Sequence, residues 1–109
     1  MATFFRNKVI KEVGTVPITA ITTDSATRSV VLGISLNNLT EGVVFASIKI
    51  QDDTSVEGFY LKDIMIPANS SLRAVPPGEK LILAGDNALK IEADIDNAYD
   101  AVISYVDIV

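Results

Sequence analysis

Alternation of apolar and polar residues with a period of two constrains the fold of this 109-residue chain most strongly. It is clearest in "SVVLGISLN" at 29–37, "VVFASIKI" at 43–50 and "ALKIEADI" at 88–95. Because successive side chains of a β-strand point to opposite faces, this pattern predicts strands with one buried face. Sustained helical spacing is not found, and β-branched residues, which favour strands, are abundant. The sequence therefore predicts an all-β fold.

Short turn signals separate the alternating runs, among them "NNLTEG", "QDDTSVEG", "PANSS" and "VPPGEK". "GDN" at 85–87 predicts a tight hairpin turn, because its residues tolerate positive φ. The predicted strands are 8–13, 16–22, 28–39, 43–51, 57–66, 70–75, 80–84, 88–95 and 98–108. Strands at this spacing are typical of a sandwich or barrel. We expect a single-domain, jelly-roll-like β-sandwich of about eight strands at 15–109, preceded at 1–14 by either an N-terminal arm or a first strand.

The alternation also predicts which side chains share a face. One face of the strand at 28–39 is expected to carry Val30, Leu32, Ile34 and Leu36. The last segment, "AYDAVISYVDIV", has apolar residues on both faces, with Tyr99 and Tyr105 on the same one. A strand that is apolar on both faces is usually central or lies against a partner.

The first residues combine aromatic and basic side chains. Phe4 and Phe5 in "ATFFRNKVI" either anchor an arm on a neighbouring molecule or belong to an ordinary first strand with one ring in the core. Arg6, Lys8 and Lys11 give residues 1–11 a charge of +3, whereas residues 86–109 carry −5. These opposed charges either attract between copies of the chain or are simply solvated.

Several classes of function are disfavoured by composition. Without cysteine there are no disulfides or thiolate metal sites, and without histidine the commonest general base and metal ligand is missing. Apolar runs fall short of the roughly 20 residues that cross a bilayer, so no membrane partner is expected. The net charge of −5 opposes binding to nucleic acid.

The acidic segments do not match known metal loops. "DIDNAYD" contains Asp94, Asp96 and Asp100 but lacks the glycine and bidentate glutamate of a calcium loop, and "DDTSVEG" is also an acidic loop. A nucleophile paired with a base is not apparent, nor is a glycine-rich phosphate loop. We therefore expect no enzyme activity, metal or cofactor. Arg73 lies inside an apolar strand, where it either pairs with Glu79 or a carboxylate across a subunit interface, or lies on the surface.

Four segments resemble small accessory virion structural proteins of tailed bacteriophages, notably those infecting cyanobacteria. They are "MATFFRNKVIKEVGT", "GISLNNLTEGVVFASIKIQDDT", "IPANSSLRAVPPGEKLIL" and "DAVISYVDIV", which together span nearly the whole chain. Their shared signature is a proline-led turn, "L…PGEKL", a "GDN" turn and a terminal strand of the "SYVDI" type. The resemblance implies a protein of the virion, on the capsid surface or at the neck or tail.

Three functions follow as hypotheses. The first is capsid cement or decoration, or a head–tail connector, by a homo-oligomer (trimer or ring) that binds major capsid or neck and tail proteins after assembly in the host cytoplasm. The second is a carbohydrate-binding module that uses Tyr60 or Tyr99, and the third, the least favoured, is a hydrolase. For the first, we predict these interface residues: Phe4, Phe5, Arg6, Lys8, Arg73, Tyr99 and Tyr105.

Overall fold

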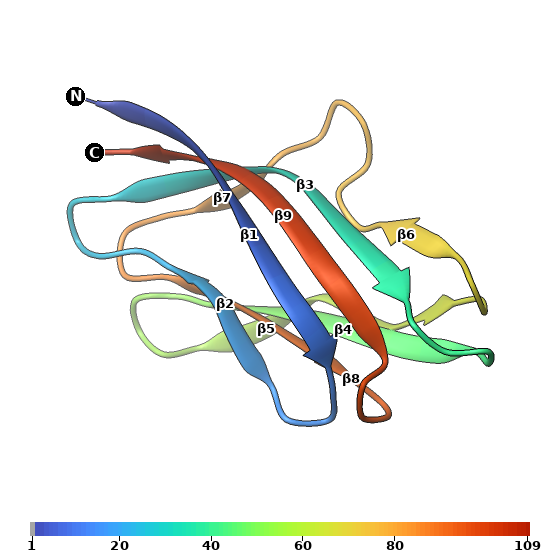
Figure 1. Ribbon diagram of the computed structural model, residues 1–109. Coiled ribbons are helices and arrows are strands. Elements are labelled where there is room, and N and C mark those ends of the chain that lie inside the picture. Colours follow the sequence, from blue (N-terminus) through green and yellow to red (C-terminus); the bar gives the residue numbers. More distant parts are fainter. Residues whose placement is uncertain (1) are drawn as a thin grey trace.

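Two antiparallel β-sheets pack face to face in the computed structural model, which describes residues 2–109 (Figure 1). The nine strands are β1 (Thr3–Val13), β2 (Ile18–Thr22), β3 (Arg28–Asn38), β4 (Val44–Gln51), β5 (Glu57–Ile66), β6 (Ser71–Arg73), β7 (Leu81–Leu83), β8 (Ala88–Ala93) and β9 (Tyr99–Ile108). Within the described residues, no helix is long and apolar enough to cross a membrane.

The strand order is that of a jelly roll. The first sheet has the order β1-β9-β3-β6, with β7 also paired to β3, and the second has the order β2-β8-β4-β5. Strands β6 and β7 both pair with β3, so together they occupy the place of one strand, interrupted by the loop that contains "VPPGEK". The jelly roll therefore has eight strand positions, one of which is divided between β6 and β7. The predicted all-β sandwich is confirmed.

The core fills the space between the two sheets. Its largest fully buried side chains are Tyr99, Ile34, Leu36, Ile48, Ile66, Leu83, Leu89, Ile91, Ile103, Val13, Val31 and Val44. Alternation predicted the buried faces of β4 and β8 correctly, since Val44, Ala46 and Ile48 are buried, as are Leu89 and Ile91. Ile95 is different because β8 ends at Ala93, and it lies 42% exposed in the following turn.

A β-bulge in β3 corrects the predicted core. The pairing of β3 with β9 shifts between Val31 and Gly33, so that Leu32 is the extra residue. One inserted residue moves the following side chains to the other face of a strand. Val31 and Ile34 therefore both point into the core, and Leu32, predicted to be buried, is 41% exposed.

Residues 3–13 form an edge strand of the first sheet. The β1 strand begins at Thr3, rather than at residue 8 as predicted, and pairs with β9 from Thr3 opposite Ile108 to Ile10 opposite Ala101. A second bulge follows between Ile10 and Val13, where Glu12 has a φ of 56°. In Figure 1, β1 and β9 run side by side, and both termini lie at the same end of the molecule.

The "GDN" turn does not close a hairpin. Asp86 has the expected positive φ, 56°. However, β7 before the turn pairs with β3 in the first sheet, whereas β8 after it pairs with β2 and β4 in the second. The turn therefore carries the chain from one sheet to the other. The turn residues predict the positive φ, whereas the pairing of the flanking strands is a tertiary property.

Candidate assembly interface

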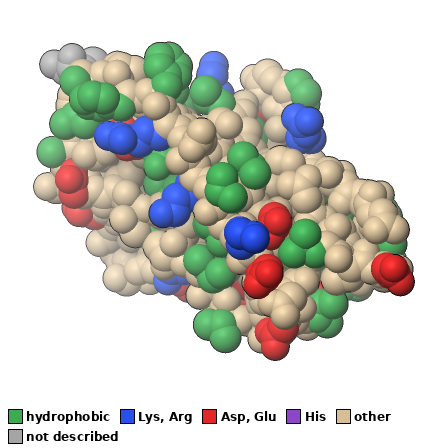
Figure 2. Space-filling view, viewed as in Figure 1, with side chains coloured by type: hydrophobic (Ala, Val, Ile, Leu, Met, Phe, Trp, Pro, Cys, Tyr) green, Lys and Arg blue, Asp and Glu red, His purple; other side chains and the backbone are tan. Residues whose placement is uncertain are grey.

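The outer face of the first sheet exposes five large hydrophobic side chains. They are Phe5, Val9, Leu32, Ile82 and Val102, and we call this surface the apolar face. Figure 2 shows hydrophobic side chains on the surface, in separate patches among lysines and arginines. Phe5 is the most exposed, at 82%. Clustered exposed apolar side chains are typical of surfaces that contact another molecule.

Strand register arranges this face in rows. One row crosses four strands and consists of Phe5, Val106, Val30 and Ile82, which are directly paired from β1 to β9, β3 and β7. A second row consists of Val9, Val102, Ser35 and Arg73, from β1 to β9, β3 and β6. Directly opposite side chains in a sheet touch, so each row is a continuous strip.

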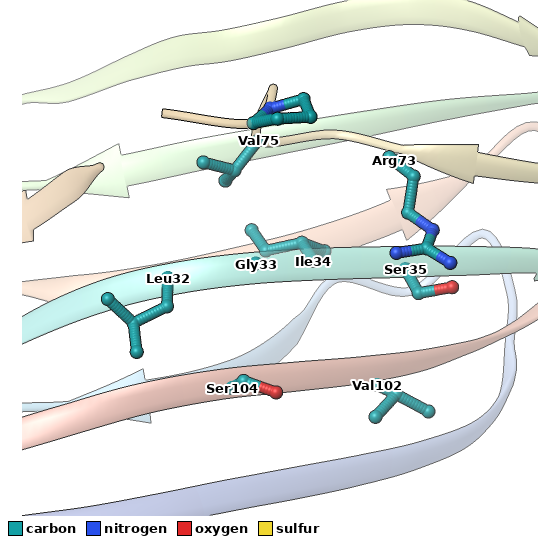
Figure 3. Close-up of a pocket in the computed structure, with 9 residues that line it drawn as sticks. Leu32, Gly33, Ile34, Ser35, Arg73, Val75, Val102 and Ser104 are labelled. Carbon is teal, nitrogen blue, oxygen red and sulfur yellow. The ribbon is translucent and has the colours of Figure 1, made fainter. Parts of the chain in front are cut away.

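A hollow of about 470 Å³ lies between these rows (Figure 3). It is lined by Leu32, Gly33, Ile34, Ser35, Arg73, Val75, Pro77, Val102 and Ser104. The hollow lies beside the gap between β6 and β7, where β3 has no paired strand opposite Leu32 and Gly33. In Figure 3 the Arg73 side chain extends from β6 across the hollow toward Ser35.

The hollow continues toward β1. A second depression, of about 280 Å³, is lined by Phe5, Arg6, Asn7, Leu32, Ser104 and Tyr105. Leu32 and Ser104 line both depressions, which therefore adjoin each other. We call these two adjoining depressions the groove; their lining residues come from β1, β9, β3, β6 and the loop after β6.

The outer face of the second sheet also exposes Phe45, Phe59 and Met65, but it differs in having two ion pairs. The Lys49 and Glu92 side chains lie 3.0 Å apart, and Lys90 and Glu57 lie 2.9 Å apart. The hydrogen bond to Glu92 raises the pKa of Lys49, and the one from Lys90 lowers the pKa of Glu57. Lys49 also lies over the Phe59 ring, 5.0 Å from its centroid. Four charged side chains of this face are thus paired within the molecule.

Four predicted interface residues line the groove: Phe5, Arg6, Tyr105 and Arg73. The Arg6 Nε donates a hydrogen bond to Asp107 Oδ2 at 2.7 Å, and its guanidinium lies 5.2 Å from the centroid of the Phe4 ring. Lys8 is exposed on the same strand. The ion pair between Arg6 and Asp107 joins the basic start and the acidic end of the chain within one molecule.

Arg73 is not neutralised by the predicted partner. No carboxylate among residues 2–109 lies within ion-pairing distance of its guanidinium, and Glu79 is in the loop after β6. Arg73 thus presents a charge at one end of the groove. Such a group is suited to a carboxylate or carbonyl oxygen of another molecule.

Tyr99 is corrected from an interface residue to a core residue. Its exposed fraction is 0%, and its hydroxyl donates a hydrogen bond to the Glu92 backbone oxygen at 2.7 Å. Tyr60, the other tyrosine considered for glycan binding, is half-buried and packs against the core. The burial of Tyr99 removes it as a platform for a sugar.

The burial of Tyr99 is expected to make folding stability depend on pH in the alkaline range. Burial raises the pKa of its phenol, whereas in the unfolded chain a tyrosine ionises near pH 10. Above pH 10 the unfolded state therefore loses the proton first, and stability falls as pH rises further. We expect the stability advantage of the wild type over Tyr99→Phe to shrink by about 1 kcal/mol between pH 8 and pH 11. Urea unfolding of both proteins at each pH measures this difference; an unchanged difference would contradict the prediction.

The acidic turn carboxylates bind backbone amides. Asp94 Oδ1 accepts a hydrogen bond from the Phe45 amide at 2.9 Å, and Asp100 Oδ1 accepts one from the Glu12 amide at 2.9 Å. Asp96 Oδ1 accepts from the Thr15 amide and hydroxyl, at 3.2 and 3.0 Å. In the part of the chain that the structure describes, no three acidic residues gather as they would to hold a metal ion. These carboxylates have a structural role.

Sequence reasoning missed several residues of the groove, Leu32 above all. Leu32 was assigned to the core, and Val102 and Ser104 were not singled out. A signal for the bulge was present, because an isolated glycine inside a strand, here Gly33, often marks one. The exposure of Leu32 follows from this single inserted residue.

Comparisons with known proteins find similarity in structure but not in sequence. The chain matches no family model, and a search of curated proteins finds no match. A chain from the capsid structure of Helicobacter pylori bacteriophage KHP30 is similar, with a TM-score of 0.53, 9% identity and coverage of 100% of this chain and 89% of that one. An IBDV viral-particle chain has a TM-score of 0.59 and 10% identity, with 96% of this chain matching 30% of it.

A third similar structure comes from Bacillus endospore appendages, described as disulfide-linked pili. Its TM-score is 0.54 at 9% identity, and the match covers 96% of this chain and 85% of that one. At such low identities these likenesses establish the fold alone.

Proposed function

We propose that this chain is a non-enzymatic structural protein of a bacteriophage virion, where it binds the capsid surface as a cement or decoration protein. The fold likeness to a phage capsid chain supports this role, since it covers 89% of that chain and all of this one. The resemblance of four sequence segments to accessory proteins of tailed phages points the same way. Fold alone does not determine function, so the proposal depends on the surface.

The observation that carries the proposal is the apolar face with its groove. Burying exposed apolar surface contributes about 25 cal/mol per Å², and Phe5, Leu32 and Val102 are all available for it. Arg73 adds a polar anchor at the groove's end. A repeated lattice such as a capsid multiplies modest contacts into tight binding. The second sheet, with its internal ion pairs, is the face we assign to solvent.

A position at the head–tail neck or in the tail would use the same surface. The two locations differ in copy number, because a capsid offers hundreds of equivalent sites and a neck or tail ring offers about six or twelve. The similar chain from the Bacillus endospore appendages assembles by a different kind of contact. Those pili are disulfide-linked, whereas this chain has no cysteine and depends on noncovalent contacts.

Quantitative mass spectrometry of purified, salt-washed particles tests the proposal. The particles come from the phage whose genome carries the gene. We expect the protein to be present, with hundreds of copies per particle for capsid decoration. A count of six or twelve would move it to the neck or tail, and its absence from intact particles would overturn the virion role.

A further inference from the structure

The outer edge of β1 has backbone groups without a partner strand. Ala2 and Val109 exchange both backbone hydrogen bonds, at 2.9 Å each, so Ala2 directs its amide and carbonyl toward β9. Hydrogen-bonding direction alternates along an antiparallel strand. The amides and carbonyls of Phe4, Arg6 and Lys8 therefore face β9, while those of Thr3, Phe5, Asn7 and Val9 face away from the sheet.

This edge is the longest regular one among the described strands. Thr3 to Ile10 pair with β9 without a register shift, and all side chains from Thr3 to Val9 are exposed. The other edge strands are short or irregular: β6 and β7 have three residues each, β2 has a register shift, and β5 has two. A long, regular, exposed edge is a template for pairing with another strand.

The charged side chains of β1 restrict the register in which two such edges can pair. In an antiparallel β1–β1 contact, residues whose groups face outward pair with each other, so the two-fold axis passes through one residue of each copy. An axis through Arg6 would place Arg6 opposite Arg6, and one through Asn7 would place Arg6 opposite Lys8. Like charges directly opposite are destabilising. An axis through Phe4 avoids them but leaves only Thr3 and Phe5 to pair.

We propose that two copies of this chain join edge to edge through β1, antiparallel, with Phe5 opposite Phe5 on the two-fold axis. Thr3 of each copy then pairs with Asn7 of the other, and Phe4 lies opposite Arg6. The Phe5 rings meet on the outer face, and each guanidinium approaches an aromatic ring, as Arg6 already does within one molecule. The pairing joins the two first sheets into one continuous sheet.

This contact adds self-association to the proposed virion function. Only the use of the contact in the particle rests on that function. Continuity of the sheets also joins the two apolar faces, which doubles the surface offered to the capsid. A two-fold contact closes as a dimer. The trimer or ring expected from the sequence therefore requires an additional interface besides β1.

Single-cysteine variants test the register cleanly, because the chain has no cysteine of its own. Opposite residues of a hydrogen-bonded antiparallel pair have Cα atoms about 5.5 Å apart, within the range of a disulfide. Two Asn7 residues would lie about 13 Å apart along the strands, beyond that range. Under mild oxidation we expect at least about tenfold more cross-linked dimer from Phe5→Cys than from Asn7→Cys.

Mixing Thr3→Cys with Asn7→Cys keeps Phe5 in place and is the complementary arm. The mixed disulfide is expected, whereas neither variant should cross-link alone. Failure of both the Phe5→Cys and the mixed cross-link would overturn the proposal, as would preferential cross-linking of Asn7→Cys. Neither outcome alters the copy number measured on particles, so the inference can fail while the virion role stands.

Proline variants provide a second readout that does not depend on oxidation. The Asn7 amide faces away from β9, so Asn7→Pro removes no hydrogen bond to β9. Proline is tolerated at an edge position whose amide faces solvent. We expect it to weaken dimerisation about tenfold or more in sedimentation. Val9→Pro removes the same kind of amide beyond the paired segment from Thr3 to Asn7 and is the matched control. Equal effects of the two variants would contradict the proposed register.

Discussion

Replacing Tyr99 by alanine is expected to lower the free energy of unfolding by about 3–5 kcal/mol. Tyr99 is completely buried and begins β9, where it is paired with Val13 on one side and Asn38 on the other. Its hydroxyl reaches the Glu92 carbonyl in β8, so the side chain ties the first sheet to the second. Alanine leaves a cavity and removes this hydrogen bond. Urea unfolding measures the loss.

Two controls separate the contributions to this loss. Tyr99→Phe keeps the ring but leaves the Glu92 carbonyl without its partner, which costs about 1–3 kcal/mol. Tyr105→Ala removes a half-buried ring and is expected to cost less than Tyr99→Ala. If Tyr99→Ala unfolded at the same urea concentration as the wild type, the core assignment of Tyr99 would be wrong.

Replacing Leu32 and Val102 together by aspartate is expected to weaken binding to particles by about 100-fold. Both side chains line the groove and are partly exposed, at 41% and 38%. Replacing them is therefore expected to cost the monomer little folding stability. Burying two carboxylates against the capsid would carry a large desolvation cost. Co-sedimentation of the labelled variant with particles that lack the native protein measures the change.

Met65→Asp is the matched control for this variant. Met65 is 55% exposed and lies opposite Phe45 on the outer face of the second sheet. It introduces one carboxylate, where the double variant introduces two, at a similarly exposed apolar position, and we expect particle binding to stay within about twofold. A control that weakened binding as much as the double variant would assign the contact to the second sheet or to a general charge effect.

Much of the fold could be predicted from local periodicity. Alternation and turn signals together predicted about eight strands, with a range near each observed strand, and alternation predicted the buried faces of β4 and β8. Burying one face of a strand enforces period two over its length. Alternation failed where one residue was inserted, since the bulge at Leu32 reverses the face of every residue on one side of it. Alternation does not determine strand order. The "GDN" turn was therefore predicted to close a hairpin, whereas it connects the two sheets.

The candidate interface could be predicted only in part. The aromatic and basic residues at the start of the chain predicted either a docking arm or a first strand with one phenylalanine ring in the core. The structure has a strand there with Phe4 and Phe5 both exposed, and it places Phe5 and Arg6 beside Tyr105 in the groove. Tyr99 has the same residue type and the same alternation as Tyr105, and burial distinguishes the two. Burial depends on the strands of the opposite sheet, which are distant in sequence. The groove itself depends on the split between β6 and β7 and has no local signature.

The central claim is that this chain acts through its sheet surfaces, by associating with copies of itself and with a larger assembly. Sedimentation-equilibrium measurements on the purified wild-type protein, from about 1 μM to 1 mM, test it most directly. We predict an average mass that rises with concentration above the 11.7 kDa of a single chain. A mass of 11.7 kDa at every concentration would contradict the account.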